Sequence, residues 1–130
     1  MTFDKFTIKA QEAIQEAVNL VQARGQQAIE PEHLLAGILK VGENVTNFLF
    51  QKLGVNSRQI EQILESQIAS LPKVQGGEPY LSRESNEVLT RAQDYASKGG
   101  DEFVSLEPML LALLTVKSTA SRILKDARHH

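Results

Sequence analysis

The side chains best suited to acid–base chemistry lie between positions 30 and 33. His33 is the only histidine inside the folded part of the sequence, and Glu30 and Glu32 closely precede it. An imidazole near carboxylates can act as a general base, but catalysis also needs a nucleophile, and the pattern supplies none. We therefore interpret His33 as a locally hydrogen-bonded side chain in the first turn of a helix. Both glutamates fit the same place, because carboxylates stabilise the free N–H groups at a helix start.

Motifs for catalysis and metal binding are missing from the rest of the sequence. It contains no phosphate-binding GxxxxGKS/T loop, no GxSxG nucleophile elbow and no HExxH zinc motif. The pair Gly76 and Gly77 is followed by Glu78 and Pro79, so it is interpreted as a turn. The count of zero cysteines excludes disulfides, thiolate zinc sites and cysteine nucleophiles. The sequence thus predicts a protein that is not an enzyme, with no catalytic residue and no metal site.

Length and composition are those of one soluble globular domain. The chain has 130 residues, of which 42% are apolar and 23% charged. Its formal charge of −2 disfavours a nucleic-acid partner. No signal-peptide pattern and no long apolar window occur, which predicts no membrane span, and the lack of cysteine is compatible with the cytoplasm. Residues 129–130, two histidines, are interpreted as the remnant of an expression tag.

Apolar residues recur at helical spacing along almost the whole chain, and no stretch shows sustained strand alternation. The sequence therefore predicts an all-α fold. Residues 71–80 contain two prolines and a glycine pair and are expected to form a linker. Asn56 and Ser82 are suited to cap the helices that follow them. The expected helices run from 7 to 24, 30 to 41, 45 to 53, 57 to 70, 82 to 98, 105 to 114 and 118 to 127.

The second half of the sequence repeats the first at a shift of 75 positions. We infer a tandem duplication of a four-helix unit, with repeat one at about 1–70 and repeat two at about 81–128 of a single domain, 1–128. Nothing in repeat two corresponds to the helix at 57–70, so the second copy is expected to lack its last helix. The identical pairs are Glu12 and Glu87, Ala17 and Ala92, Gly25 and Gly100, Glu32 and Glu107, Leu35 and Leu110, and Leu39 and Leu114.

The repeats differ in apolar bulk. Ala28 and Pro31 of repeat one correspond to Phe103 and Leu106 of repeat two, and residues 3–8 add further apolar groups before the first helix. If the copies pack about a pseudo-twofold axis, these groups line a groove between them, and an apolar groove with a polar rim marks a protein-binding site. The alternative is that they fill gaps in the core.

Four segments of the sequence resemble a known family. Residues 6–11, 29–35, 71–76 and 100–107 are similar to the N-terminal domain of the Clp ATPases, the double Clp-N repeat, and the resemblance covers residues 1–128. Within this family the chain looks closest to the disaggregating chaperones. Members linked to proteases repeat a Gly-Thr-Glu-His-Ile-Leu-Leu signature in both halves, whereas the second half here lacks it.

The resemblance implies a mobile domain tethered to a hexameric AAA+ ring. Such a domain engages unfolded or aggregated polypeptides for ATP-driven disaggregation by the rest of the protein. ATP and magnesium would be bound after residue 130, and the parent would be a cytoplasmic homohexamer that cooperates with a DnaK-type chaperone in the stress response. This chain alone would need no cofactor and would bind neither nucleic acid nor membrane. The alternative is an adaptor-docking domain of an unfoldase that feeds a protease.

The resemblance also assigns substrate contact to three polar positions. These are Thr7, Asp101 and Glu107, whose hydroxyl and carboxylates can bond to peptide N–H groups or basic side chains. Each also has a structural interpretation, as a helix cap, a turn former and a first-turn acid respectively. The apolar residues expected beside them, in a possible groove, are Ile8, Val88, Leu106 and Met109.

Overall fold

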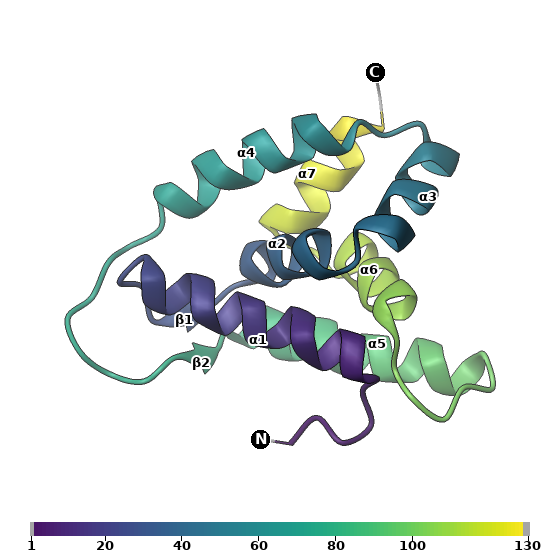
Figure 1. Ribbon diagram of the computed structural model, residues 1–130. Coiled ribbons are helices and arrows are strands. Elements are labelled where there is room, and N and C mark those ends of the chain that lie inside the picture. The colour runs from purple at the N-terminus through teal and green to yellow at the C-terminus, as the bar shows by residue number, and fades with distance from the viewer. Residues whose placement is uncertain (1, 129–130) are drawn as a thin grey trace.

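A computed structural model describes residues 2–128, so the two histidines interpreted as a tag remnant lie outside it. Helices dominate the described residues, which confirms the all-α prediction, and every predicted helix is present with bounds within two residues of those expected. Its α-helices are α1 (Ile8–Ala23), α2 (Pro31–Val41), α3 (Glu43–Leu53), α4 (Ser57–Ala69), α5 (Arg83–Lys98), α6 (Leu106–Thr115) and α7 (Thr119–Ala127) (Figure 1).

Side-chain caps fix where the helices begin. The Thr7 hydroxyl accepts from the Ala10 amide at 3.2 Å, and the Ser82 hydroxyl accepts from the Ser85 amide at 3.1 Å. The side-chain Oδ1 atom of Asn56 accepts from the amides of Arg58 and Gln59 in the first turn of α4, as its residue type predicted. Each cap satisfies an N–H group that has no partner inside its own helix.

Two short strands were not predicted. β1 (Ala28–Ile29) pairs in parallel with β2 (Tyr80–Leu81), and a further parallel bridge joins Phe6 to Val104. A strand of two residues is too short to show the alternation by which strands are recognised in a sequence.

The two copies are joined reciprocally. Phe6 of repeat one pairs with Val104 of repeat two, and Leu81 of repeat two pairs with Ile29 of repeat one. These positions correspond at the shift of 75, because 6 maps to 81 and 29 to 104. The segment before α5 thus pairs with the segment before α2, and the segment before α1 pairs with the segment before α6. This exchange relates the two copies by a pseudo-twofold axis.

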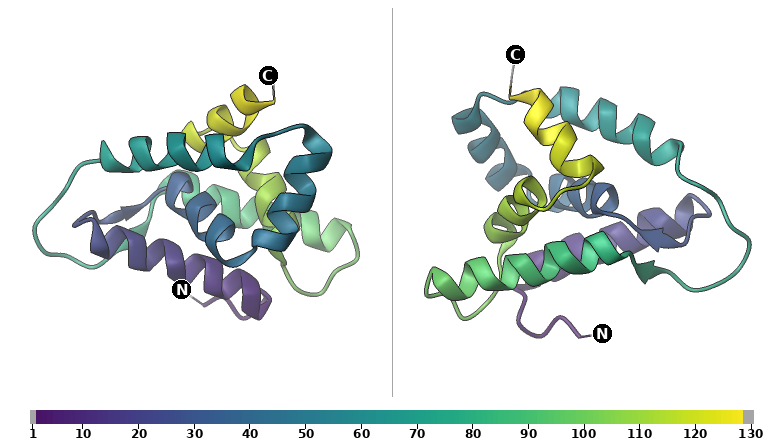
Figure 2. Two further views of the ribbon diagram at one scale, coloured as in Figure 1. Left: turned by 45° about the horizontal axis from the view of Figure 1, so that its top comes forward. Right: turned by 180° about the vertical axis from the view of Figure 1, so that it is seen from behind.

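Helix α2 lies at the centre of the molecule, in contact with α1, α3, α4, α6 and α7. Leu34, Leu35 and Ile38 are fully buried in the core. A side chain at Gly37 would place its Cβ 2.2 Å from the Ala13 carbonyl oxygen, so this glycine permits the close approach of α1 and α2. Helix α4 lies across the top of the molecule beside α7, and the linker after α4 loops out at one side in both orientations of Figure 2.

Candidate functional site

The segment between α5 and α6 brings together the three polar positions expected to contact substrate. The Thr7 amide donates to the Val104 carbonyl at 2.9 Å, and the Val104 amide donates to the Lys5 carbonyl at 2.7 Å. Val104 lies three residues from both Asp101 and Glu107. The start of α1 and the start of α6 are therefore held at one edge of the molecule.

Exposed apolar side chains lie at the same edge. Ile8, the first residue of α1, is 79% exposed, and Phe103 is 46% exposed. Asp101 and Glu107 are also exposed, whereas Thr7 is half-buried and caps α1. We call these five residues the acidic edge. It combines apolar contact area with carboxylates that lack an ion-pair partner among residues 2–128.

Three of the four apolar residues predicted to line a surface groove are buried in the structure. Val88 and Met109 are fully buried and Leu106 is 4% exposed, so of the four residues only Ile8 faces solvent. Leu106 packs beside Gly42, where a Cβ would lie 2.3 Å from its Cδ1 atom. Three of the residues fill the core, which is the alternative that the sequence left open.

A different apolar pocket is present, with a volume of about 480 Å³. It lies among α3, α6, α7 and the end of α5, and Asp101 and Glu107 contribute to its wall. From the sequence we do not predict that α3 lines a pocket. The signal for it is that the apolar residues of α3 are too many to lie on a single core-facing stripe. The apolar side chains that line it include Leu49, Phe50, Leu53, Val55, Leu110, Leu111, Leu114 and Leu124.

The pocket occupies a defined place in the pseudosymmetry. Helix α4 packs on α2, α3 and α7. The duplication relates α2 to α6 and α3 to α7, so the counterpart of α4 would pack on α6, α7 and α3, which are the helices around the pocket. No helix of residues 2–128 takes that place, so the apolar lining of the pocket is open to solvent there.

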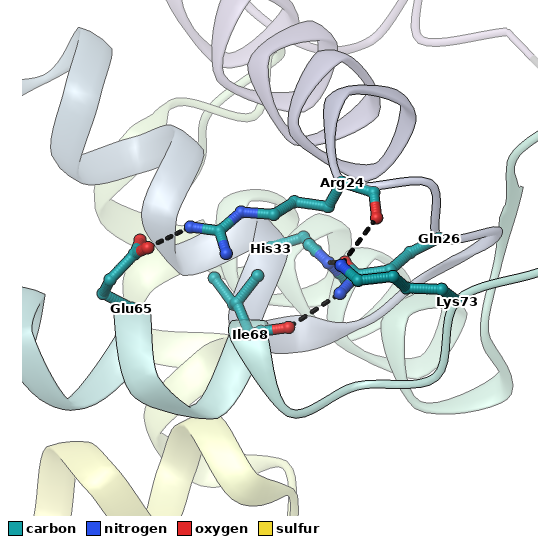
Figure 3. A network of polar contacts seen from close by, with 6 residues as sticks. All are labelled: Arg24, Gln26, His33, Glu65, Ile68 and Lys73. Atoms are coloured by element: carbon teal, nitrogen blue, oxygen red, sulfur yellow. Dashed lines mark hydrogen bonds and ion pairs between the residues drawn. The ribbon is translucent and has the colours of Figure 1, made fainter.

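His33 belongs to a buried polar network rather than to a reactive site (Figure 3). Its Nδ1 atom accepts from the Glu30 amide at 2.9 Å, and its Nε2 atom donates to the Gln26 side-chain oxygen at 2.8 Å. The Gln26 amide nitrogen donates in turn to the Ile68 carbonyl at 2.7 Å. The local bond was predicted, whereas the connection to α4 was not. Burial, with a smaller effect of the Arg24 charge, lowers the pKa of His33 to about 4.

Glu32 is buried at the start of α2, and burial raises the pKa of its carboxyl group. The nearby charges of Glu30 and Glu84 act in the same direction, and the charge of Arg122 opposes them. Within residues 2–128 no cluster of three His, Asp or Glu side chains is arranged to hold a metal ion. A search of the same residues for a helix long and apolar enough to cross a membrane found none.

Comparisons with known proteins give one family. The model described as "Clp repeat (R) N-terminal domain" matches residues 5–127. The chain is 72% identical over 127 residues to the "Chaperone protein ClpB" of Bacteroides thetaiotaomicron and 50% identical over 127 residues to that of Porphyromonas gingivalis. Each match covers 98% of this chain, which spans only 15% of either relative.

Solved structures show the same fold. The Hsp104 N-terminal domain from Candida albicans superposes with a TM-score of 0.84 at 24% identity, covering 95% of this chain and 81% of that one. The N-terminal domain of the ClpV1 ATPase from E. coli gives a TM-score of 0.80 at 23% identity, covering 95% and 83%.

Proposed function

The chain belongs to the Clp repeat (R) N-terminal domain family, and on this premise we propose that it is the substrate-binding N-terminal domain of a ClpB-type chaperone. In this proposal it engages unfolded or aggregated polypeptides and presents them to the rest of the protein for ATP-driven disaggregation. The identity of 72% to a ClpB chaperone over nearly the whole chain supports this branch of the family.

The acidic edge is the observation that favours polypeptide binding. An unfolded chain offers backbone N–H groups, basic side chains and exposed apolar side chains. Asp101 and Glu107 can accept hydrogen bonds from the first two, while Ile8 and Phe103 can contact the third. A small surface that recognises many different sequences cannot be closely complementary to any one of them, so the proposed binding is weak and tolerant of sequence.

The remaining functions of the whole protein lie outside this chain. In this proposal the chain itself carries out no catalysis, and the parent protein binds ATP and magnesium in its other domains. We place it in the cytoplasm as a homohexamer that cooperates with a DnaK-type chaperone. These assignments extend the proposal from the ClpB relatives, of which the chain spans 15%.

Mapping by NMR tests the proposal. The ¹⁵N-labelled chain is titrated with reduced, carboxymethylated α-lactalbumin, which is permanently unfolded. We expect saturable shift changes at the amides of Ile8, Phe103 and Glu107. A folded chain whose amides do not respond at any concentration would contradict the proposal. Tight, stoichiometric binding of a folded adaptor without a response to the unfolded client would favour the protease-unfoldase alternative.

A further inference from the structure

The turn after α5 repeats the turn after α1 in detail. Gly25 and Gly100 both adopt positive φ, 66° and 81°. The Gly25 amide donates to Gln22 at 3.1 Å and the Gly100 amide donates to Ser97 at 3.0 Å. The next amides, of Gln26 and Asp101, each bond to a helix carbonyl at 2.9 Å. The carbonyl groups of Gly25 and Gly100 are therefore placed alike relative to their helices.

In repeat one this turn is covered by an extended segment of the chain itself. The Val74 amide donates to the Gly25 carbonyl at 2.9 Å. The preceding side chain, Lys73, donates its ammonium to the Arg24 carbonyl at 3.1 Å, as Figure 3 shows. Further along, the side-chain Nε2 atom of Gln27 donates to the Glu78 carbonyl at 3.3 Å. The linker thus binds the turn through the backbone N–H groups of Val74 and Tyr80 and through one basic side chain, that of Lys73.

In repeat two the equivalent turn is uncovered. No backbone N–H of residues 2–128 bonds to the Gly100 carbonyl. The side chains of Asp101, Glu102 and Phe103 are exposed. Residues 99–103 therefore present the same backbone groups as residues 24–28, with nothing from the described chain seated on them.

The side chains of the two turns differ in charge. The side chains of Gln26 and Gln27, which donate hydrogen bonds to the Leu71 and Glu78 carbonyls of the covering segment, correspond to Asp101 and Glu102. A carboxylate only accepts hydrogen bonds, so the uncovered turn suits a segment that offers donors and positive charge.

We propose that the turn of residues 99–103 binds an extended client segment containing lysine or arginine, in the manner in which the linker binds residues 24–28. A backbone N–H of the client donates to the Gly100 carbonyl. The basic side chain before it reaches the Gly99 carbonyl and the Asp101 carboxylate. This inference rests on the proposed function, since it names the client feature that the acidic edge recognises.

The chain's own linker supplies the probe. An acetylated, amidated hexapeptide with the sequence of residues 71–76 is titrated into the ¹⁵N,¹³C-labelled chain. We expect saturable changes at the Gly100 carbonyl carbon and at the amides of Asp101 and Phe103, with none at Gln26. N-methylation of the peptide valine removes the single backbone donor and weakens binding by about fivefold or more. Replacement of the peptide lysine by glutamate abolishes binding.

Protein variants complete the test. Asp101→Asn weakens peptide binding by about threefold, whereas Asp94→Asn, an equal charge change at an exposed site on α5, leaves it unchanged. Equal binding of the N-methylated peptide, or shifts at Gln26, would overturn the inference. Shifts at Asp101 that depend on protein concentration without peptide would assign the turn to a second copy of the chain and also overturn it.

The two proposals fail differently. If the unfolded client still perturbs Ile8 and Glu107 while the hexapeptide does not perturb residues 99–103, only this inference is wrong. If the unfolded client perturbs no amide either, the proposed function fails with it.

Discussion

The backbone amide of Thr7 donates to the carbonyl of Val104 at 2.9 Å, and this bond joins the two sequence repeats. Its counterpart, from the Ser82 amide to the Ile29 carbonyl, measures 3.1 Å. The segment before α2 pairs with repeat two, and the segment before α6 pairs with repeat one. Unfolding of either repeat therefore breaks both pairings. The acidic edge consequently draws residues from both repeats.

Substitution of Thr7 should separate its cap from any role in binding. Thr7→Ala removes the acceptor for the Ala10 amide and should lower the free energy of unfolding by about 1 kcal/mol. Thr7→Ser keeps the hydroxyl and should restore stability. Urea denaturation measures both effects, and an alanine variant as stable as the parent chain would contradict the capping role.

Ser82→Ala is the matched control for Thr7→Ala, because it removes the equivalent cap of α5. It should cost a similar free energy of unfolding but leave client binding unchanged, since Ser82 is buried away from the acidic edge. A loss of client binding in the Thr7 variant alone would assign the Thr7 hydroxyl to substrate contact.

The His33 network predicts acid sensitivity. The pKa of His33 is about 4 in the folded chain and near its ordinary value of 6.5 when unfolded. Between these values the unfolded state binds the extra proton, so the free energy of unfolding should fall as the pH drops from 6.5 to 4. The full effect is about 3 kcal/mol. Urea denaturation at a series of pH values measures it.

His33→Gln is the control for this pH dependence, because glutamine can still donate to Gln26 but does not titrate. In the His33→Gln variant, the free energy of unfolding should no longer fall between pH 6.5 and pH 4. Glu32 acts in the opposite direction, since its raised pKa favours folding at low pH and this contribution is lost as the pH rises. The comparison is therefore made in a Glu32→Gln background. An equal slope with histidine and glutamine would exclude His33 as its source.

The contact of α1 with α2 predicts that Gly37 tolerates no side chain. Gly37→Ala would drive its Cβ against the Ala13 carbonyl oxygen and should destabilise the chain by about 3 kcal/mol. Gly25→Ala meets no neighbouring atom and bears only the strain of its positive φ, so it should cost about 1 kcal/mol. Thermal unfolding compares the two, and a smaller loss for Gly37→Ala would contradict the close approach.

The helices were predictable from the sequence because their signals are local. Polar caps such as Thr7, Asn56 and Ser82 and apolar stripes at helical spacing are read within a few residues of each other. The duplication was visible for the same reason, since identical residues recur at one shift. The reciprocal pairing of Phe6 with Val104 was not predictable, because no local pattern marks a bridge between residues so far apart.

The candidate site was predictable only in part. Asp101 and Glu107 are exposed as expected, but a sequence does not tell which side of a stripe meets solvent, and so Val88 and Met109 were misplaced. The role of Gln26 is not predictable from a local pattern, because its partner, the Ile68 carbonyl, lies 42 residues away. The pocket was also missed, since its walls come from separate helices.

Phe103 is predicted to contribute to binding rather than to folding. Its side chain is 46% exposed, so Phe103→Ser should change the free energy of unfolding by less than about 1 kcal/mol. Loss of its apolar contact should weaken binding of an unfolded client by about fivefold. Fluorescence anisotropy of a labelled client measures the affinity, and unchanged binding would remove Phe103 from the acidic edge.

The most direct measurement compares two charge-matched double variants in binding the labelled, unfolded client. Asp101→Asn with Glu107→Gln removes both carboxylates of the acidic edge, and Asp94→Asn with Glu87→Gln removes two exposed carboxylates from α5. We predict that the first pair weakens client binding by about tenfold, while the second binds as the parent chain does. Equal affinities for the two variants, with both chains folded, would contradict the assignment of client binding to the acidic edge.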